Sequence, residues 1–197
     1  ICIRAHVGAG KFPLPHNRPD PPPPNKFAHR TAEHLRLLEY LVATDPMDHA
    51  VRFNYSLKLF ENLEFDAVVE HMRVVDRLAP GLPNGNYILG MSLMFTGDAA
   101  AGREFIAEEK VEQRRVSGLA SVNCALGWDD EAEPLLAPMR DPDWWTQANF
   151  EGAFMAGAAL AFCGEVDQAY EALETHIENG GYVDDEHFPH DPRFENL

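Results

Sequence analysis

Apolar residues recur at helical spacing from Thr31 onward, and this pattern predicts an all-α fold for most of the chain. The first helix is expected to begin at Thr31 and to end near Pro46, because a proline disfavours helical backbone at the residue before it. Two further amphipathic helices fit residues 52–80, with a break at residues 62–64. The last residue of that segment, Pro80, lies 34 residues after Pro46, and this spacing indicates a repeated helix pair.

Residues 1–30 have a different pattern, in which prolines replace the helical periodicity. Three separate prolines precede four consecutive ones at residues 21–24, a composition that excludes a helix and favours extended polyproline II. We therefore predict two regions: an extended Pro-rich arm or linker over residues 1–30 and a helical domain over residues 31–197.

Glycines mark the expected turns inside the later helix pairs. Each of the dipeptides Gly97-Asp98, Gly127-Trp128 and Gly164-Glu165 is followed by a small residue and then by a large apolar one. Glycine suits the end of a helix because it adopts a positive φ without steric cost. Small residues also recur where the paired helices are expected to cross closely: Gly90, Ala120, Gly157, Ala132 and Ala169.

These features together resemble the tetratricopeptide-repeat (TPR) family, in particular divergent bacterial members, whose unit is a pair of antiparallel helices. The match is best over residues 47–110 and 150–177, although the turns are unevenly spaced and the bulky aromatic residue expected early in each first helix is mostly absent. Residues 191–194, Asp-Pro-Arg-Phe, resemble the ending of many bacterial TPR proteins. The resemblance implies a right-handed solenoid of about four units followed by a tail.

In the TPR family, the first helix of each pair lines a concave groove and the second forms the convex back. The resemblance therefore implies a scaffold without catalytic activity that holds a peptide or a partner subunit in this groove. The residues it places on the groove are Phe53, Asn54, Leu57, Tyr87, Ile88, Met91, Ser121, Phe154 and Met155. The alternative for each is that it packs against neighbouring helices or against the Pro-rich arm. Asn54 alone matches the carboxylate clamp of the family, so recognition of a C-terminal carboxylate is not expected.

The net charge of −16 lies almost entirely in the last third of the chain. Residues 1–127 carry 15 acidic and 14 basic residues, whereas residues 128–197 carry 17 acidic residues and only Arg140 and Arg193 as bases. An acidic surface repels phosphates, which excludes nucleic acid and anionic membranes as favoured partners. It attracts basic proteins, so the expected partner is basic or apolar; the alternative is that the charge serves only solubility.

Candidate chemistry is sparse, and no coherent set of catalytic residues was found. Residues 2–6, Cys-Ile-Arg-Ala-His, resemble a c-type haem attachment run in which alanine replaces the second cysteine. This leaves a second hypothesis open, in which Cys2 and His6 bind haem and the helices form an accessory domain of a larger redox protein similar to multihaem cytochromes. No other cofactor and no metal site are expected. Cys124 and Cys163 lie in apolar stretches and are predicted to be buried free thiols.

The compartment is left open by the sequence. No apolar run reaches the roughly 18 residues needed to span a bilayer. The first residue is Ile1, so we expect the native start to be missing, and the N-terminus does not identify the compartment. Both a cytoplasmic and an exported, periplasmic location agree with these observations, as do self-assembly and a larger complex.

Overall fold

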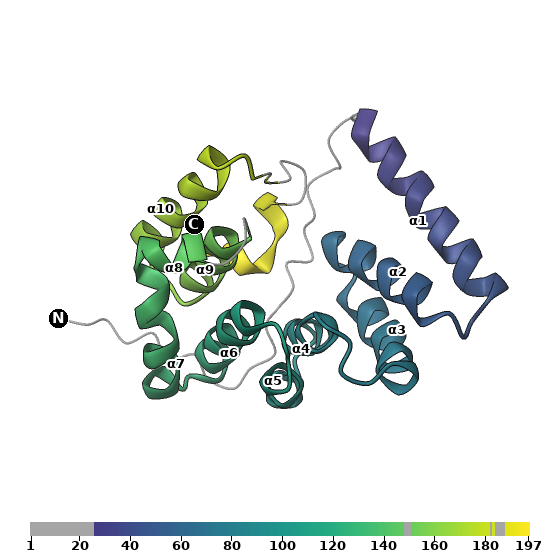
Figure 1. Ribbon diagram of the computed structural model, residues 1–197, viewed down its shortest axis with the longest axis horizontal. Helices are drawn as coiled ribbons and strands as arrows, with labels where there is room; N and C mark the ends of the chain where they lie inside the picture. The colour runs from purple at the N-terminus through teal and green to yellow at the C-terminus, as the bar shows by residue number, and fades with distance from the viewer. Residues whose placement is uncertain (1–25, 148–150, 182, 184–187) are drawn as a thin grey trace.

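The computed structural model describes residues 26–147, 151–181, 183 and 188–197, and every regular element in these residues is helical (Figure 1). The α-helices in chain order are α1 (Lys26–Thr44), α2 (His49–Glu61), α3 (Phe65–Leu78), α4 (Gly85–Phe95), α5 (Ala99–Ala107), α6 (Glu112–Leu126), α7 (Asp129–Leu136), α8 (Pro142–Gln147), α9 (Gly152–Phe162) and α10 (Val166–Glu178). Three short 3-10 helices are η1 (Ala137–Arg140), η2 (Phe188–His190) and η3 (Pro192–Phe194). The predicted all-α fold class is confirmed.

The first helix begins earlier than the sequence pattern indicated. We expected it to start at Thr31, whereas α1 starts at Lys26, so the last residues of the predicted arm, 26–30, are helical. The reason is that the prolines end at Pro24, and nothing after them opposes a helix. Residues 1–25 of the predicted arm lie outside the described residues.

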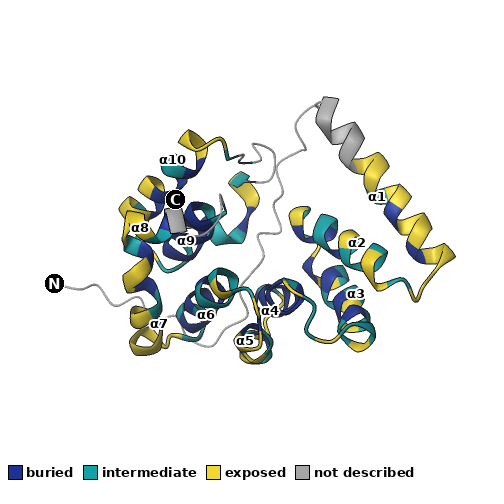
Figure 2. Cartoon of the chain, viewed as in Figure 1, coloured by how far each residue is buried: buried dark blue, intermediate teal, exposed yellow. Residues whose placement is uncertain are grey.

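The helices pack mainly in consecutive pairs. The pairs are α2 with α3, α4 with α5, α6 with α7, and α9 with α10. The first helices also contact one another, α2 with α4, α4 with α6, and α6 with α9, and the chain follows an arc with these four helices on its inner side (Figure 1). We call α2, α4, α6 and α9 the inner helices and α3, α5, α7 and α10 the outer helices. Burial follows this arrangement, since α4 and α9 are buried along almost their whole length (Figure 2).

The four inner helices end in the same turn. A backbone N–H two or three residues after the helix donates to the carbonyl five residues before it: Glu64→Leu59, Asp98→Leu93, Trp128→Asn123 and Glu165→Leu160, at 2.8–2.9 Å. The residue between has a positive φ: 98° at Gly97, 70° at Gly127 and 84° at Gly164, as the sequence predicted. In the first pair Leu63 takes this position with φ 62°. The outer helix α10 ends in the same turn, in which Gly181 donates to the carbonyl oxygen of His176 at 2.8 Å and Gly180 has φ 82°.

The close crossings predicted from small residues are present. A Cβ atom on Gly90 would overlap the side chain of Ile106 and lie 2.6 Å from the carbonyl oxygen of Gly102. A Cβ atom on Gly157 would lie 2.8 Å from Cγ of Leu173 in α10. Both glycines therefore allow an inner helix to approach its outer partner more closely than any larger residue would.

Replacing Gly90 with leucine is expected to lower the free energy of unfolding by about 2 kcal/mol, because the added atoms force α4 and α5 apart. Ala169→Leu, at the fully buried contact of α10 with α9, is expected to act in the same way. The control is Ala100→Leu, at an exposed position of α5, which should change stability by no more than about 0.5 kcal/mol. Urea unfolding measures this effect. Equal midpoints for Gly90→Leu and Ala100→Leu would show that α4 and α5 do not cross closely at Gly90.

The described helices give no indication of a membrane span, since none combines the length and the apolar character that crossing a bilayer requires.

Candidate functional site

The inner side of the arc is occupied by a segment of the chain itself. Residues 188–197, which we call the tail segment, fold into η2 and η3 after α10 and return toward the inner helices (Figure 1). Helix η3 packs against α9, and Phe194 is buried in the core formed by the last helices. The tail segment therefore lies against α9, the helix that carries two residues of the predicted groove, Phe154 and Met155.

Arg193 is the centre of this contact. Its guanidinium carbon lies 5.5 Å from the ring centroid of Phe60 in α2 and 5.3 Å from that of Phe154 in α9. The Tyr87 side chain in α4 also acts on the guanidinium and raises its pKa. Cation–π contacts of this kind gain strength as water is removed, and the Arg193 side chain is only 14% exposed. One side chain of the tail segment thus touches three inner helices.

The charge of Arg193 is balanced from within the tail segment. Nη2 lies 2.5 Å from Oδ2 of Asp191, and Nε lies 3.0 Å from both carboxylate oxygens. The same carboxylate accepts the backbone N–H of Arg193 at 2.9 Å and so caps η3. Burial by itself lowers the pKa of the guanidinium, but Asp191 and Tyr87 more than offset this effect and hold the pKa above its ordinary value. Arg193 is therefore a buried cation with its own counter-ion.

Further contacts hold the two ends of the tail segment. The Phe194 ring packs on Phe154, with centroids 5.7 Å apart, and on Phe188 at 4.4 Å. The Asn196 amide donates to the carbonyl oxygens of Ala161 and Phe162 at 3.0 and 3.1 Å, in the last turn of α9. These contacts hold the tail segment through aromatic packing and through hydrogen bonds to backbone carbonyls.

The walls around Arg193 are held by contacts other than the tail segment. Phe60 packs edge-on against Phe65, with centroids 5.5 Å apart. The Tyr87 ring lies under the Arg114 guanidinium at 5.7 Å. Phe154 contacts His176 of α10 at 5.4 Å. We call Phe60, Tyr87 and Phe154 the aromatic cage.

The predicted groove residues divide into two groups. Five of them are buried in the packing between helices: Tyr87, Ile88, Met91, Ser121 and Met155. Within this group Tyr87 contacts Arg193. Phe53, Leu57 and Phe154 are half-buried, and Asn54 is exposed, although its amide bonds to the carbonyl oxygen of Ala50 in its own helix. Phe60 and Arg193 were not among the predicted site residues. The sequence did single out Arg193, because it is one of only two bases in a strongly acidic third of the chain.

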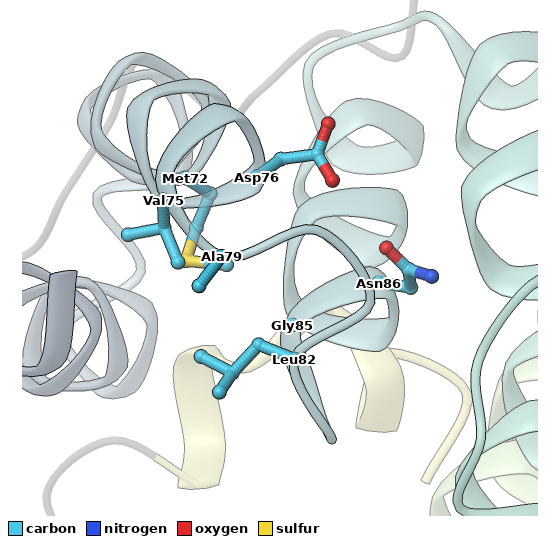
Figure 3. Close-up of a pocket in the computed structure, with 7 residues that line it drawn as sticks. All are labelled: Met72, Val75, Asp76, Ala79, Leu82, Gly85 and Asn86. Carbon is cyan, nitrogen blue, oxygen red and sulfur yellow. The ribbon is translucent and has the colours of Figure 1, made fainter.

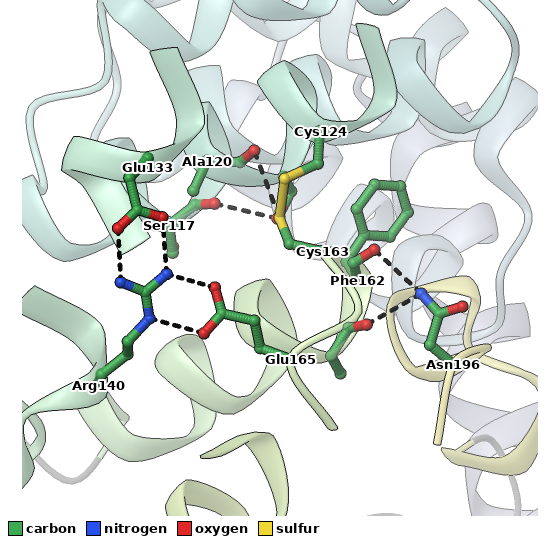
Figure 4. The surroundings of a disulfide bond; sticks show 11 residues. Ser117, Ala120, Cys124, Glu133, Arg140, Phe162, Cys163, Glu165 and Asn196 are labelled. Carbon is green, nitrogen blue, oxygen red and sulfur yellow. Dashed lines mark hydrogen bonds and ion pairs between the residues drawn. A yellow bond between two sulfur atoms is a disulfide. The ribbon is translucent and has the colours of Figure 1, made fainter. Parts of the chain in front are cut away.

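The cysteine prediction is wrong for two of the three residues. Cys124 in α6 and Cys163 at the end of α9 form a disulfide, where the sequence predicted free thiols (Figure 4). Their separation of 39 residues hides the pairing in the sequence, because it arises only when α6 packs against α9 along the arc. Cys2 and His6, the proposed haem ligands, lie outside the described residues.

The other base of the acidic third, Arg140, lies near the disulfide and is also paired internally (Figure 4). Nη1 and Nη2 donate to the two oxygens of Glu133, and Nε and Nη2 donate to the two oxygens of Glu165, at 2.6–2.8 Å. These hydrogen bonds raise the pKa of Arg140 above its ordinary value. Each of the two arginines in the acidic third is therefore paired with carboxylates of the same chain.

Two recesses lie beside α3 in the described part of the chain. The recess between α3 and the start of α4, lined by Met72, Val75 and Leu82 among others, has a volume of about 10 Å³, room for a single water molecule (Figure 3). A wider depression of about 390 Å³ on the outer side is open and lined by acidic side chains such as Asp76, Glu104 and Glu108. Across the described part of the chain, no three His, Cys, Asp or Glu residues are grouped so as to hold a metal ion.

Stability is expected to fall below neutral pH through His71, which joins α2 to α3. Its Nδ1 lies 2.7 Å from Nη1 of Arg52, and burial, followed by the Arg52 charge, lowers the pKa of His71. The folded state therefore resists protonation of His71. The contribution of neutral His71 to the free energy of unfolding is complete above the unfolded pKa of about 6.5 and is lost as pH falls through the folded pKa. Urea unfolding at pH 7.5 and 5.5 should show a larger loss in wild type than in His71→Gln. An equal loss in both would contradict the prediction.

Comparison of the chain with models of known protein families, with curated proteins and with solved structures finds no match.

Proposed function

We propose that this protein is a TPR-like solenoid without catalytic activity, which binds a peptide or partner subunit on the inner side of its arc. The observation that carries the proposal is the tail segment, a peptide-like stretch seated on three inner helices through Arg193. The shared turn at the ends of α2, α4, α6 and α9 supports the repeat assignment. The order of contacts, inner helix to inner helix and outer helix to the next inner helix, supports a solenoid over a closed bundle.

The chemistry of the surface supports a partner that is basic or apolar. The last third of the chain carries 17 acidic residues, and both of its arginines are paired internally. Such a surface attracts positive charge over a distance and repels nucleic acid. The disulfide favours the exported of the two locations that the sequence left open, because disulfides persist in oxidising compartments.

The second candidate, an accessory domain of a redox protein with haem on Cys2 and His6, is motivated by the sequence of residues 2–6 alone. The visible spectrum of the native protein separates the two proposals, since attached haem gives a Soret band. A covalent adduct of haem mass on the peptide containing Cys2 would favour the redox assignment.

The interaction proposal is tested with a partner isolated from the native source and identified by mass spectrometry. Two half-buried aromatic residues form a matched pair: Phe53 on the inner helix α2 and Phe105 on the outer helix α5. Phe53→Ala is expected to weaken partner retention at least tenfold, about 1.4 kcal/mol, while Phe105→Ala leaves it unchanged. Loss of binding only with Phe105→Ala would place the partner on the outer side and contradict the proposal.

A further inference from the structure

The aromatic cage is a site that recognises an arginine side chain. Phe60, Tyr87 and Phe154 come from three different helices. The Arg193 guanidinium lies over the rings of Phe60 and Phe154, and the Tyr87 side chain raises its pKa. Aromatic faces attract cations, and arginine in particular stacks on them. Each of the three side chains also has a contact outside the tail segment, with Phe65, Arg114 and His176 respectively.

The tail segment indicates what else a ligand of this cage must carry. Asp191, two residues before the arginine, supplies the carboxylate that balances a buried charge. Phe194, directly after the arginine, packs on the outer part of Phe154. Asn196 then donates to the carbonyl oxygens of Ala161 and Phe162 at the end of α9. The bound sequence therefore reads acid, any residue, arginine, aromatic.

We propose that the inner side recognises partner segments of the form Asp-x-Arg-aromatic, and that the tail segment occupies this site as an intramolecular competitor. The inference rests on the proposed function and names the class of segment that the site takes. The acidic surface of residues 128–197 attracts such an arginine-bearing segment before it reaches the cage. A competitor in the same chain reduces the apparent affinity for a partner segment, which equals the intrinsic affinity multiplied by the fraction of molecules whose site is open.

The probe is a fluorescein-labelled peptide of residues 188–197, added to the full chain and followed by anisotropy. Wild type is expected to bind it weakly. Arg193→Ala combined with Phe194→Ala removes both anchors of the tail segment and should bind the peptide at least about tenfold more tightly, because the competitor is gone. The same peptide with alanine at the arginine position should lose at least about tenfold in affinity for this variant.

A milder variant keeps the test decisive if the double variant does not fold. Asn196→Ala removes two hydrogen bonds and leaves both anchors in place, and it should tighten peptide binding about threefold. Circular dichroism establishes that each variant is folded. Peptide binding that is no tighter in the folded variants than in wild type, or that is independent of the arginine, would overturn the inference.

Two outcomes separate this inference from the proposed function. If the peptide binds no variant but the native partner is still lost with Phe53→Ala, the inner side binds a different class of segment and only the inference fails. If the peptide binds as expected but the partner is retained by Phe53→Ala, the cage assignment stands and the proposed function fails. A wild-type dimer in light scattering that disappears on Arg193→Ala would show that the tail segment binds a second copy, and would overturn the intramolecular competition.

Discussion

Reduction of the Cys124–Cys163 disulfide is expected to lower the free energy of unfolding by about 4 kcal/mol. The two cysteines are 39 residues apart, so the bond closes a long loop and removes much of the conformational freedom of the unfolded chain. It also connects α6 to the end of α9, two inner helices between which α7, η1 and α8 intervene in the sequence. Guanidinium unfolding with and without reductant measures the effect.

The control for this prediction is the third cysteine. Cys2→Ser should leave the unfolding midpoint unchanged, whereas Cys124→Ala combined with Cys163→Ala should reproduce the effect of the reductant. Alkylation of the untreated protein, followed by intact mass measurement, should add a single label, at Cys2. Three labels in protein taken directly from its native host would show that the disulfide is absent there, and would remove the support for an exported location.

Replacing Glu109 with alanine is expected to lower the free energy of unfolding by about 3 kcal/mol. The Glu109 side chain follows α5 and is only 3% exposed, and its carboxylate accepts the backbone N–H groups of Asn84 at 3.1 Å and of Tyr87 at 3.0 Å at the start of α4. It also accepts those of Lys110 and Val111 at 2.8 and 2.9 Å. A negative charge at this end of a helix is favourable, and buried donors left without an acceptor cost roughly 1–3 kcal/mol each.

The neighbouring residue provides the matched control. Glu108 is exposed at the end of α5, so Glu108→Ala should change stability by no more than about 0.5 kcal/mol. Glu109→Gln retains one acceptor oxygen, so its free energy of unfolding should lie between those of Glu108→Ala and Glu109→Ala. Because α4 carries Tyr87, loss of this cap should also loosen the aromatic cage. A Glu109→Ala variant as stable as Glu108→Ala would show that the carboxylate does not support α4.

Much of the fold was predictable because it depends on local geometry. A helix that ends at Gly97 or Gly164 needs a residue with positive φ, and glycine at that position is visible in the sequence. A crossing that requires Gly90 is also visible, since no side chain fits there. The turn at Leu63 has the same geometry but no glycine, so the sequence indicated the break at residues 62–64 without its conformation.

The candidate site was harder to predict because it depends on how the arc curves. The resemblance placed Ile88 and Met91 on a groove, but the inner helices lie close enough to bury both. The pairing of Cys124 with Cys163 and the place of Arg193 beside Phe60 have the same origin, since each joins residues that only the arc brings together. Helical periodicity identifies the inward face of a helix and leaves open what that face contacts.

The most direct test of the central claim is photo-cross-linking of the native partner from the two sides of the arc. A p-benzoylphenylalanine placed at Phe53 on the inner helix α2, or at Phe105 on the outer helix α5, changes one aromatic residue for another in each case. We expect a partner adduct from position 53 and none from position 105, with the cross-linked partner peptide containing an arginine followed by an aromatic residue. Adducts from position 105 alone would contradict it, because the partner would then bind the outer side.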